Sequence, residues 1–131
     1  MRILADTSAF LAVALDEPER PWLIEVTDGA VLVAPAVLPY ELGNALSAMA
    51  RRGRLDAKQV AKVWRAVAAI PVTLIEPDMA PALALAVEHG IYAYDAYFLH
   101  CAAHLRCPLL TLDRDMQRVG RGLGIKVLEQ P

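Results

Sequence analysis

Long apolar runs, repeats and linkers are all missing from this chain of 131 residues. The absence of any run of about 18 apolar residues excludes an ordinary membrane-spanning helix. Arg2 and the apolar residues after it begin like a signal peptide, but Asp6 interrupts that run. We therefore expect one domain, residues 1–131, in a soluble, cytoplasmic protein.

Cysteine and net charge are also low. The chain has two cysteines, Cys101 and Cys107, whose spacing is not that of a metal-ligand pair, so we expect reduced, half-buried thiols. The formal net charge of −2 carries no signal for a uniformly basic, nucleic-acid-binding surface. Local arginine and lysine side chains would have to hold the backbone of any RNA or DNA substrate.

Hydrophobic residues, in contrast, are abundant. They make up 56% of the chain, above the ~45–50% that is usual for globular proteins. So large a share predicts apolar surface that is left over after folding. We therefore expect a homo-oligomer, with a homodimer as the first expectation, or a complex with a partner protein.

Short apolar runs alternate with longer helical patterns, which is typical of a parallel sheet covered on both faces. The predicted strands are residues 2–5, 30–33, 72–75, 109–112 and 126–128. The predicted helices lie near residues 8–15, 21–27, 37–52, 57–69, 79–89, 95–105 and 114–120. A capping box at Asp56 and Gln59 supports one helix start, and Gly90 supports one helix end. The expected fold class is α/β, a three-layer α/β/α domain with a mostly parallel central sheet of about five strands.

Four carboxylates lie where a folded core would exclude an unpaired charge. Asp6 and Asp113 each close an apolar, strand-like run. Asp95 lies on the apolar face of a predicted helix, and Glu41 lies at the edge of the apolar stripe of another. Ligands bind open parallel sheets beyond the carboxyl ends of the strands, so Asp6 and Asp113 are expected to share one site.

Two of these acids have an alternative interpretation as helix caps. Either Asp6 or Ser8 would be the N-cap of the helix near residues 8–15. That role suits Ser8 well, but it leaves Asp6 at the end of a buried strand without an explanation. Asp95 would begin its own helix, where the helix dipole favours an anion. A carboxylate in a first turn can also point into a pocket, so both roles can hold together.

The other two acids have structural alternatives as well. A glutamate at the edge of an apolar stripe, as Glu41 is, usually lies on the solvated surface. Asp113 and Asp115 flank one arginine, and a strand-ending turn or an N-cap would account for one of the two aspartates. We favour Asp113 for the site because it lies closer to the strand end, and Asp115 is a secondary candidate.

A bound divalent cation would explain why these acids are grouped. A charge placed against a core costs several kcal/mol unless it is paired or ligates a metal, and no lysine or arginine lies at matching places in the sequence. Mg²⁺ prefers oxygen ligands and is usually held by only one or two carboxylates. The remaining acids would hold its waters or a second ion. The sequence thus predicts one acidic, cation-filled pocket suited to phosphoryl chemistry.

The acids belong to four short motifs that follow one another along nearly the whole chain. These are Asp6-Thr7-Ser8, Tyr40-Glu41-Leu42-Gly43-Asn44, Tyr94-Asp95-Ala96 and Thr111-Leu112-Asp113-Arg114-Asp115. In this order the chain resembles the PIN-domain nucleases, and in size it is most similar to the VapC-type toxins of bacterial toxin–antitoxin pairs. One departure is Met116, where family members often carry an aromatic residue.

The resemblance implies a PIN-like fold and a role for each acid. Asp6 and Asp95 would be the main Mg²⁺ or Mn²⁺ ligands, while Glu41 and Asp113 would take the places of the second and fourth acids. It implies a metal-dependent endoribonuclease that hydrolyses RNA phosphodiesters through a water activated by the ion. It also implies an antitoxin protein that covers the acidic site.

Five further residues are predicted to contact the RNA. Thr7, Ser8 and Asn44 could hydrogen-bond the scissile phosphate or a bound water. Arg51 and Arg52 lie on the side of their helix that carries Asn44, so they could bind phosphates beside the site. The alternative is a solvated helix end, where cations suit the helix dipole in any case.

Two other functions stay open. A metal-dependent phosphatase on a similar sheet usually carries Asp-x-Asp after the first strand, whereas no second aspartate follows Asp6 here. A PIN-like RNA-binding module that has lost catalysis is the other alternative, and the presence of all four acids argues against it.

Two further features of the sequence resemble parts of a binding site. His100 and His104 have the i, i+4 spacing of a zinc pair, but they fall on the side of their helix opposite Asp95, so we expect outward-facing histidines. Tyr92 and Tyr94 offer rings that could stack on nucleobases.

Overall fold

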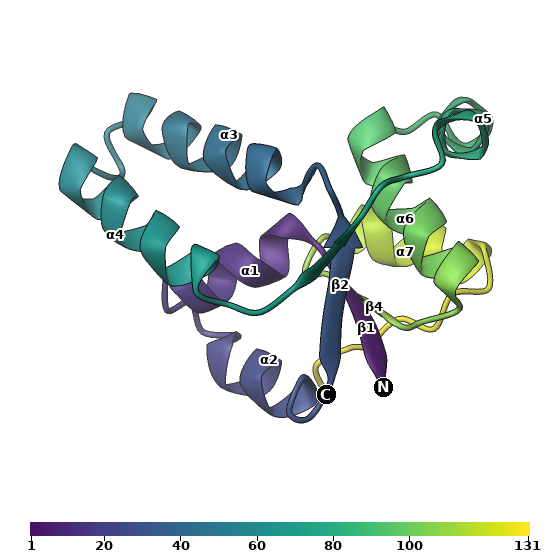
Figure 1. Ribbon diagram of the computed structural model, residues 1–131, viewed down its shortest axis with the longest axis horizontal. Coiled ribbons are helices and arrows are strands. Elements are labelled where there is room, and N and C mark those ends of the chain that lie inside the picture. The colour runs from purple at the N-terminus through teal and green to yellow at the C-terminus, as the bar shows by residue number, and fades with distance from the viewer.

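A sheet of four parallel strands lies at the centre of the computed structural model, which describes residues 1–131 (Figure 1). The strands are β1 (Arg2–Ala5), β2 (Val31–Pro35), β3 (Thr73–Ile75) and β4 (Leu109–Leu110). Their spatial order is β3-β2-β1-β4. The two central strands end in buried residues, as strands covered on both faces do. The α/β class and the parallel sheet are therefore confirmed.

The predicted strand at residues 126–128 is wrong, so the sheet has four strands rather than about five. This segment makes one isolated parallel bridge, between Val127 and Leu109. The reason lies in its neighbour, because β4 is only two residues long and the chain turns away before Asp113. Strand β4 is therefore too short for residues 126–128 to form a full strand beside it.

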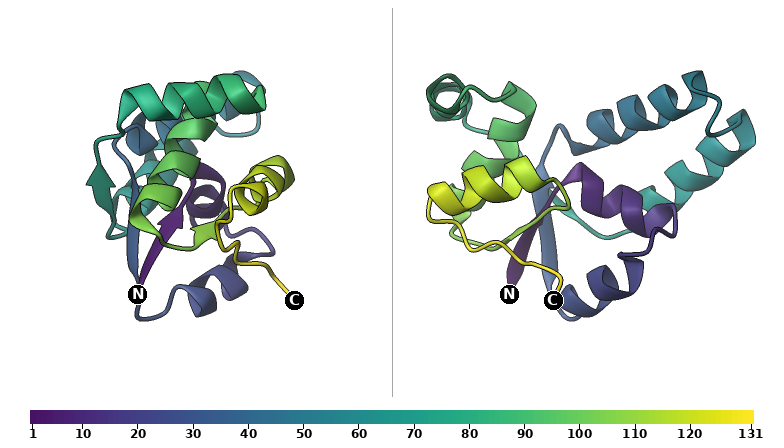
Figure 2. Two further views of the ribbon diagram at one scale, coloured as in Figure 1. Left: turned by 90° about the vertical axis from the view of Figure 1, so that its right-hand side faces the viewer. Right: turned by 180° about the vertical axis from the view of Figure 1, so that it is seen from behind.

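Seven helices connect and cover the strands. They are α1 (Thr7–Ala14), α2 (Arg20–Val26), α3 (Leu38–Arg51), α4 (Ala57–Ala68), α5 (Met79–His89), α6 (Ala93–Leu105) and α7 (Arg114–Gly122). Helices α1 to α4 lie on one side of the sheet and α5 to α7 on the other, which gives the predicted three layers (Figures 1 and 2). None of the seven has both the length and the hydropathy that crossing a bilayer requires.

Local sequence chemistry sets several helix boundaries. The predicted capping box is present at the start of α4, where Asp56 accepts a hydrogen bond from the Gln59 backbone N–H and the Gln59 side chain accepts one from the Asp56 N–H, both at 2.8 Å. Gly90 ends α5 in the left-handed conformation, with φ of 61°. These two predictions are confirmed.

The hydrophobic core fills the space between the sheet and the two helix layers. Ile3 and Leu4 of β1, Leu109 of β4, and Phe98 and Leu99 of α6 are all almost completely buried. Helix α7 also packs closely on the sheet edge, because a Cβ at Gly120 would lie 3.1 Å from Leu109 Cδ2. This packing fixes α6 and α7 against the strand ends that carry the acids.

The order of the strands places a crevice at the carboxyl end of β1. From β1 the chain moves to β2 and β3 on one side, and then returns to β4 on the other side of β1. Such a reversal is where ligands bind in open parallel sheets. Both ends of the chain lie at the opposite end of the molecule from this crevice, toward the amino ends of the strands (Figures 1 and 2).

Candidate active site

The crevice holds a pocket of about 260 Å³, and all four predicted acids line it. Its lining consists of Asp6, Thr7, Ser8, Leu11, Glu41, Asp95, Phe98, Asp113 and Met116. These residues come from the ends of β1 and β4 and from α1, α3, α6 and α7. The fold thus brings together four carboxylates that are spread over more than a hundred positions of the sequence.

Asp6 is the most enclosed of the acids, with 7% of its surface exposed. The Ser8 hydroxyl donates to Asp6 Oδ1 at 2.6 Å, and the Thr111 hydroxyl donates to Asp6 Oδ2 at 2.5 Å. Asp6 is also the N-cap of α1, because Oδ1 accepts the Ala9 backbone N–H at 3.3 Å. Of the two predicted cap candidates, Asp6 is therefore the cap, and Ser8 lies inside the helix.

Thr111 is a site residue to which the sequence analysis assigned no role. It is fully buried and donates to Asp6, while its hydroxyl oxygen accepts the Asp113 backbone N–H at 3.0 Å. It therefore links the end of β1 to the end of β4. The available signal was a polar residue within an otherwise apolar strand-like run, since such a residue must find a hydrogen-bond partner when buried.

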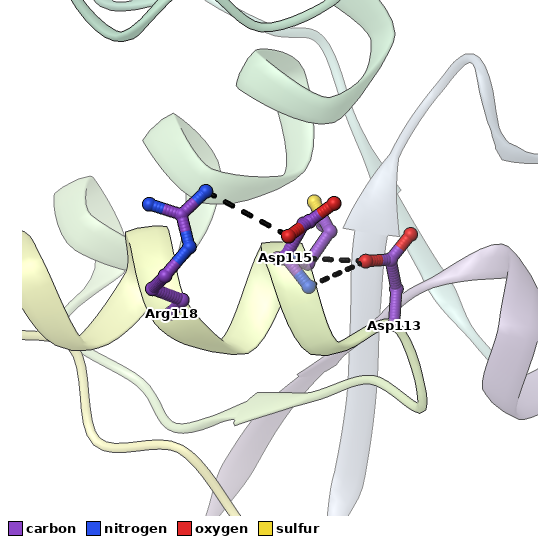
Figure 3. Close-up of polar contacts among 4 residues, drawn as sticks. Asp113, Asp115 and Arg118 are labelled. Carbon is purple, nitrogen blue, oxygen red and sulfur yellow. Dashed lines mark hydrogen bonds and ion pairs between the residues drawn. The ribbon is translucent and has the colours of Figure 1, made fainter.

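Asp113 caps α7 and faces the pocket at the same time. Its Oδ1 accepts the backbone N–H groups of Asp115 at 2.9 Å and Met116 at 3.1 Å (Figure 3). Asp115 does not line the pocket; its side chain is 89% exposed and forms an ion pair with Arg118 at 3.7 Å. Met116, at the position where the resemblance expects an aromatic residue, is buried and lines the pocket.

Glu41 and Asp95 extend into the pocket from the first turns of α3 and α6. Glu41 is half-buried, and its Oε2 accepts the Thr7 hydroxyl at 2.7 Å. Asp95 is also half-buried, but its carboxylate makes no hydrogen bond or ion pair. The prediction that α6 begins at Asp95 is wrong by two residues, because the cap is Tyr92 and the helix starts at Ala93. Asp95 is therefore free of a capping role.

The pocket raises the pKa of Asp6, Glu41 and Asp95. Burial raises the pKa of Asp6 from 3.8 to about 6, against the opposing effect of the Ser8 and Thr111 hydrogen bonds. Burial also raises the pKa of Glu41, with a further contribution from the charge of Asp95. The pKa of Asp95 is raised by burial and by the charges of Asp113 and Asp115.

No basic side chain neutralises these acids. The two ion pairs in the structure join Arg118 to Asp115 and Arg121 to Glu129, and neither includes an acid that lines the pocket. A concave, acidic site without a cationic side chain has the electrostatics of a cation-binding site. A bound cation would offset the free-energy cost of burying the carboxylate charges and would reduce their mutual repulsion.

The donor set suits a hard divalent ion. No three acidic, histidine or cysteine side chains converge on a single point in the way a fully protein-coordinated metal requires. Mg²⁺ does not require that arrangement, since it is usually held by one or two carboxylates and keeps several waters. The all-oxygen lining therefore fits a partly hydrated Mg²⁺ or Mn²⁺ ion.

The residues predicted to contact RNA divide into two groups. Thr7 and Ser8 line the pocket, and Asn44 lines a neighbouring pocket. Arg51 and Arg52 are exposed at the far end of α3, about 15 Å along the helix axis from Glu41 at 1.5 Å per residue. The fold does not bring these two arginines into the acidic pocket, and their contact with RNA stays a prediction.

The features set aside in the sequence lie outside the pocket. The His100 and His104 rings stack with their centroids 5.8 Å apart and line no part of the acidic site. Cys101 and Cys107 are free thiols, as expected, and are buried rather than half-buried.

Comparison with known proteins identifies the family. Residues 3–122 match the sequence profile of the PIN domain. The chain belongs to the PIN domain family. Among curated relatives, this PIN domain is 32% identical to Ribonuclease VapC3 of Pyrobaculum aerophilum over 88% of its own length and 92% of that protein. It is 31% identical to Exonuclease VapC9 of the same organism over 91% of its length and 86% of that protein.

Solved structures share the fold. A crystal structure of PAE2754 from Pyrobaculum aerophilum superposes with a TM-score of 0.69 at 28% identity, covering 95% of this chain and 98% of that chain. The VapBC2 structure from Rickettsia felis, bound to a DNA fragment from its promoter, gives a TM-score of 0.66 at 12% identity, with 98% of each chain covered. The three-layer fold of the PIN domain is therefore confirmed.

Proposed function

We propose that this PIN domain is an endoribonuclease that depends on Mg²⁺ or Mn²⁺, and that it is the toxin of a toxin–antitoxin pair. The observation that carries the proposal is the acidic pocket. Four carboxylates meet there without a cationic partner, at the place where the strand order of the sheet reverses. Membership of the PIN family and the ribonuclease names of its relatives support RNA as the substrate.

Each acid has a role in this proposal. Asp6 and Asp95 would hold the ion directly, while Glu41 and Asp113 would orient its waters or complete a second site. The ion would activate a water for attack on phosphorus and stabilise charge on the phosphoryl oxygens. The Ser8 and Thr111 hydroxyls hold both oxygens of Asp6 in place, and the Thr7 hydroxyl holds Glu41. These contacts fix the carboxylates before the RNA binds.

Cleavage of RNA with and without divalent ions tests the proposal. We expect the purified domain, free of any partner protein, to cut RNA in Mg²⁺ or Mn²⁺ and to lose this activity in EDTA, with recovery when the ion is restored. A circular RNA should be cut as well as a linear one, because an endonuclease needs no free end.

Other outcomes of that experiment would assign another function. Cutting of the linear RNA alone would indicate an exonuclease, the activity that the name of one relative states. RNA binding without cleavage would favour the catalytically inactive RNA-binding module. Hydrolysis of simple phosphomonoesters, with RNA left intact, would favour the metal-dependent phosphatase. Activity that survives EDTA would contradict the proposed role of the acidic pocket.

We also propose two protein partners, a cognate antitoxin that covers the acidic pocket and a second copy of this chain, both in the cytoplasm. The uncompensated acids suit a cationic side chain of an antitoxin. For the dimer, Met79, Leu83 and Val87 lie at i, i+4 and i+8 of α5, where Val87 is 84% exposed. We expect light scattering to give twice the mass of the chain and Val87→Glu to give a monomer. A monomeric wild type would contradict the dimer.

A further inference from the structure

A second pocket adjoins the acidic one between the first turns of α3 and α6. Its volume is about 410 Å³, and it is lined by Thr7, Val37, Tyr40, Glu41, Asn44, Ala45 and Tyr94. Thr7 and Glu41 belong to the linings of both pockets, so the two are continuous. A molecule bound in the second pocket would therefore lie directly beside the carboxylates.

Two exposed tyrosines line this second pocket from different helices. Tyr40 of α3 is 78% exposed and Tyr94 of α6 is 55% exposed, so both rings are accessible to a ligand. Neither hydroxyl has a hydrogen-bond partner within the protein. Tyr97 packs edge-on against the Tyr94 ring, with the ring centroids 5.9 Å apart and the planes at 86°. That contact supports the Tyr94 ring and leaves the rest of it accessible.

Asn44 adds an unused polar group to the same pocket. It lies one helical turn after Tyr40, so the two side chains share a face of α3. Its backbone carbonyl accepts a hydrogen bond from the Ser47 hydroxyl, but its side-chain amide makes no hydrogen bond in the protein. The amide carries both donors and an acceptor, which is what pairing with the edge of a nucleobase requires.

The residues that line the second pocket indicate which class of ligand it can bind. It contains no lysine or arginine, and Glu41 is its one charged residue, so a phosphate group would be repelled rather than bound. Aromatic rings with one neutral amide suit a flat, uncharged ring with polar edges. Proteins bind single-stranded RNA in this way, by stacking its bases on aromatic side chains and hydrogen-bonding their edges.

We propose that this pocket binds one unpaired nucleobase of the RNA, next to the phosphodiester that is cut, with Tyr40 and Tyr94 stacking on the base and Asn44 contacting its edge. The inference rests on the proposed function, because it assumes an RNA substrate in the acidic pocket. In this proposal, Tyr40, Tyr94 and Asn44 determine which base the enzyme prefers beside the scissile bond.

Alanine and phenylalanine variants of the two tyrosines test this assignment through kinetics. We expect Tyr40→Ala and Tyr94→Ala each to raise the KM for a single-stranded RNA by roughly 5- to 100-fold, which corresponds to the loss of one base–aromatic stack, with little change in kcat. Tyr40→Phe and Tyr94→Phe should retain near-normal KM because they keep the ring. Tyr92→Ala is the matched control, since Tyr92 is 82% exposed and does not line the pocket.

The base preference provides a second readout that a structural role would not change. With a randomised RNA pool, wild type should favour particular bases at one position beside the cut. That preference should weaken in the two alanine variants and change in Asn44→Asp, because a carboxylate accepts hydrogen bonds but cannot donate them. Unchanged KM and unchanged base preference in all of these variants would overturn the assignment.

Binding measured without cleavage separates this inference from the proposed function. In an Asp6→Asn background, we expect a short fluorescent RNA to bind, and to bind more weakly when Tyr40→Ala or Tyr94→Ala is added. If wild type cuts no RNA but these binding losses appear, the base pocket stands without the nuclease. If the tyrosine variants leave RNA binding intact, or weaken only the binding of a partner protein, the assignment is wrong.

Discussion

Asp95→Asn is expected to reduce the rate of RNA cleavage by at least about 100- to 1,000-fold, the scale of losing one group that stabilises transition-state charge. Asp95 lines the acidic pocket from the first turn of α6 and is one of the two proposed direct metal ligands. An amide is a much weaker ligand for Mg²⁺ than a carboxylate. Mn²⁺ titrated calorimetrically should therefore bind the variant more weakly than wild type.

The structure indicates that this substitution removes a proposed metal ligand without removing a contact that stabilises the fold. The Asp95 carboxylate makes no hydrogen bond or ion pair, so its loss should leave the melting temperature unchanged or slightly higher. Asp28→Asn is the matched control, because it makes the same change of charge at an exposed position near the amino end of β2. If Asp95→Asn cut RNA as fast as the control, the acidic pocket would not be the catalytic site.

Asp6→Asn is expected to abolish cleavage and to stabilise the metal-free protein. The pKa of Asp6 is raised by burial from 3.8 to about 6, so at neutral pH the folded state holds a buried charge that the unfolded state solvates easily. At ~1.4 kcal/mol per pKa unit, the charge costs on the order of 2 to 3 kcal/mol. Asparagine removes it, and the Ser8 and Thr111 hydroxyls can accept as well as donate hydrogen bonds.

The dependence on pH has a definite sign. Because the pKa is higher in the folded state, the contribution of Asp6 to stability is fully present below pH 3.8 and is lost as the pH rises to about 6. The raised pKa values of Glu41 and Asp95 act in the same direction. Thermal unfolding in EDTA should show the variant melting several degrees above wild type at pH 7.5, with a smaller gap at pH 5.

Added Mg²⁺ should reverse part of this difference. A ligand that binds the folded state alone raises its melting temperature, so Mg²⁺ should stabilise wild type and Asp28→Asn but have little effect on Asp6→Asn. A variant that melts below wild type at pH 7.5 in EDTA would show that the Asp6 hydrogen bonds outweigh the cost of its burial, and this prediction would then be wrong.

The acidic pocket could be predicted from the sequence because strand ends are visible in it. Asp6 and Asp113 each follow an apolar run, and a parallel sheet places the carboxyl ends of its strands at one edge. Glu41 was harder to assign, since its position at the edge of an apolar stripe also suits a surface residue. The resemblance to PIN-domain nucleases, rather than periodicity, favoured its assignment to the site.

Other features depend on contacts that a single sequence does not display. The number of strands was overestimated because pairing of residues 126–128 depends on the length of β4, which is set by where α7 begins. The hydroxyl of Thr111 bonds to a carboxylate 105 positions away. The pocket between Tyr40 and Tyr94 exists only because α3 and α6, on opposite sides of the sheet, start beside the same strand ends.

The position of the two chain ends has a practical consequence for work with long substrates. Both chain ends lie toward the amino ends of the strands, whereas the carboxylates lie at the carboxyl ends of the strands (Figure 2). An affinity tag or a surface tether attached at either terminus would hold the molecule on the side opposite the acidic pocket. A structured RNA far larger than this domain could then approach the open face without meeting the support.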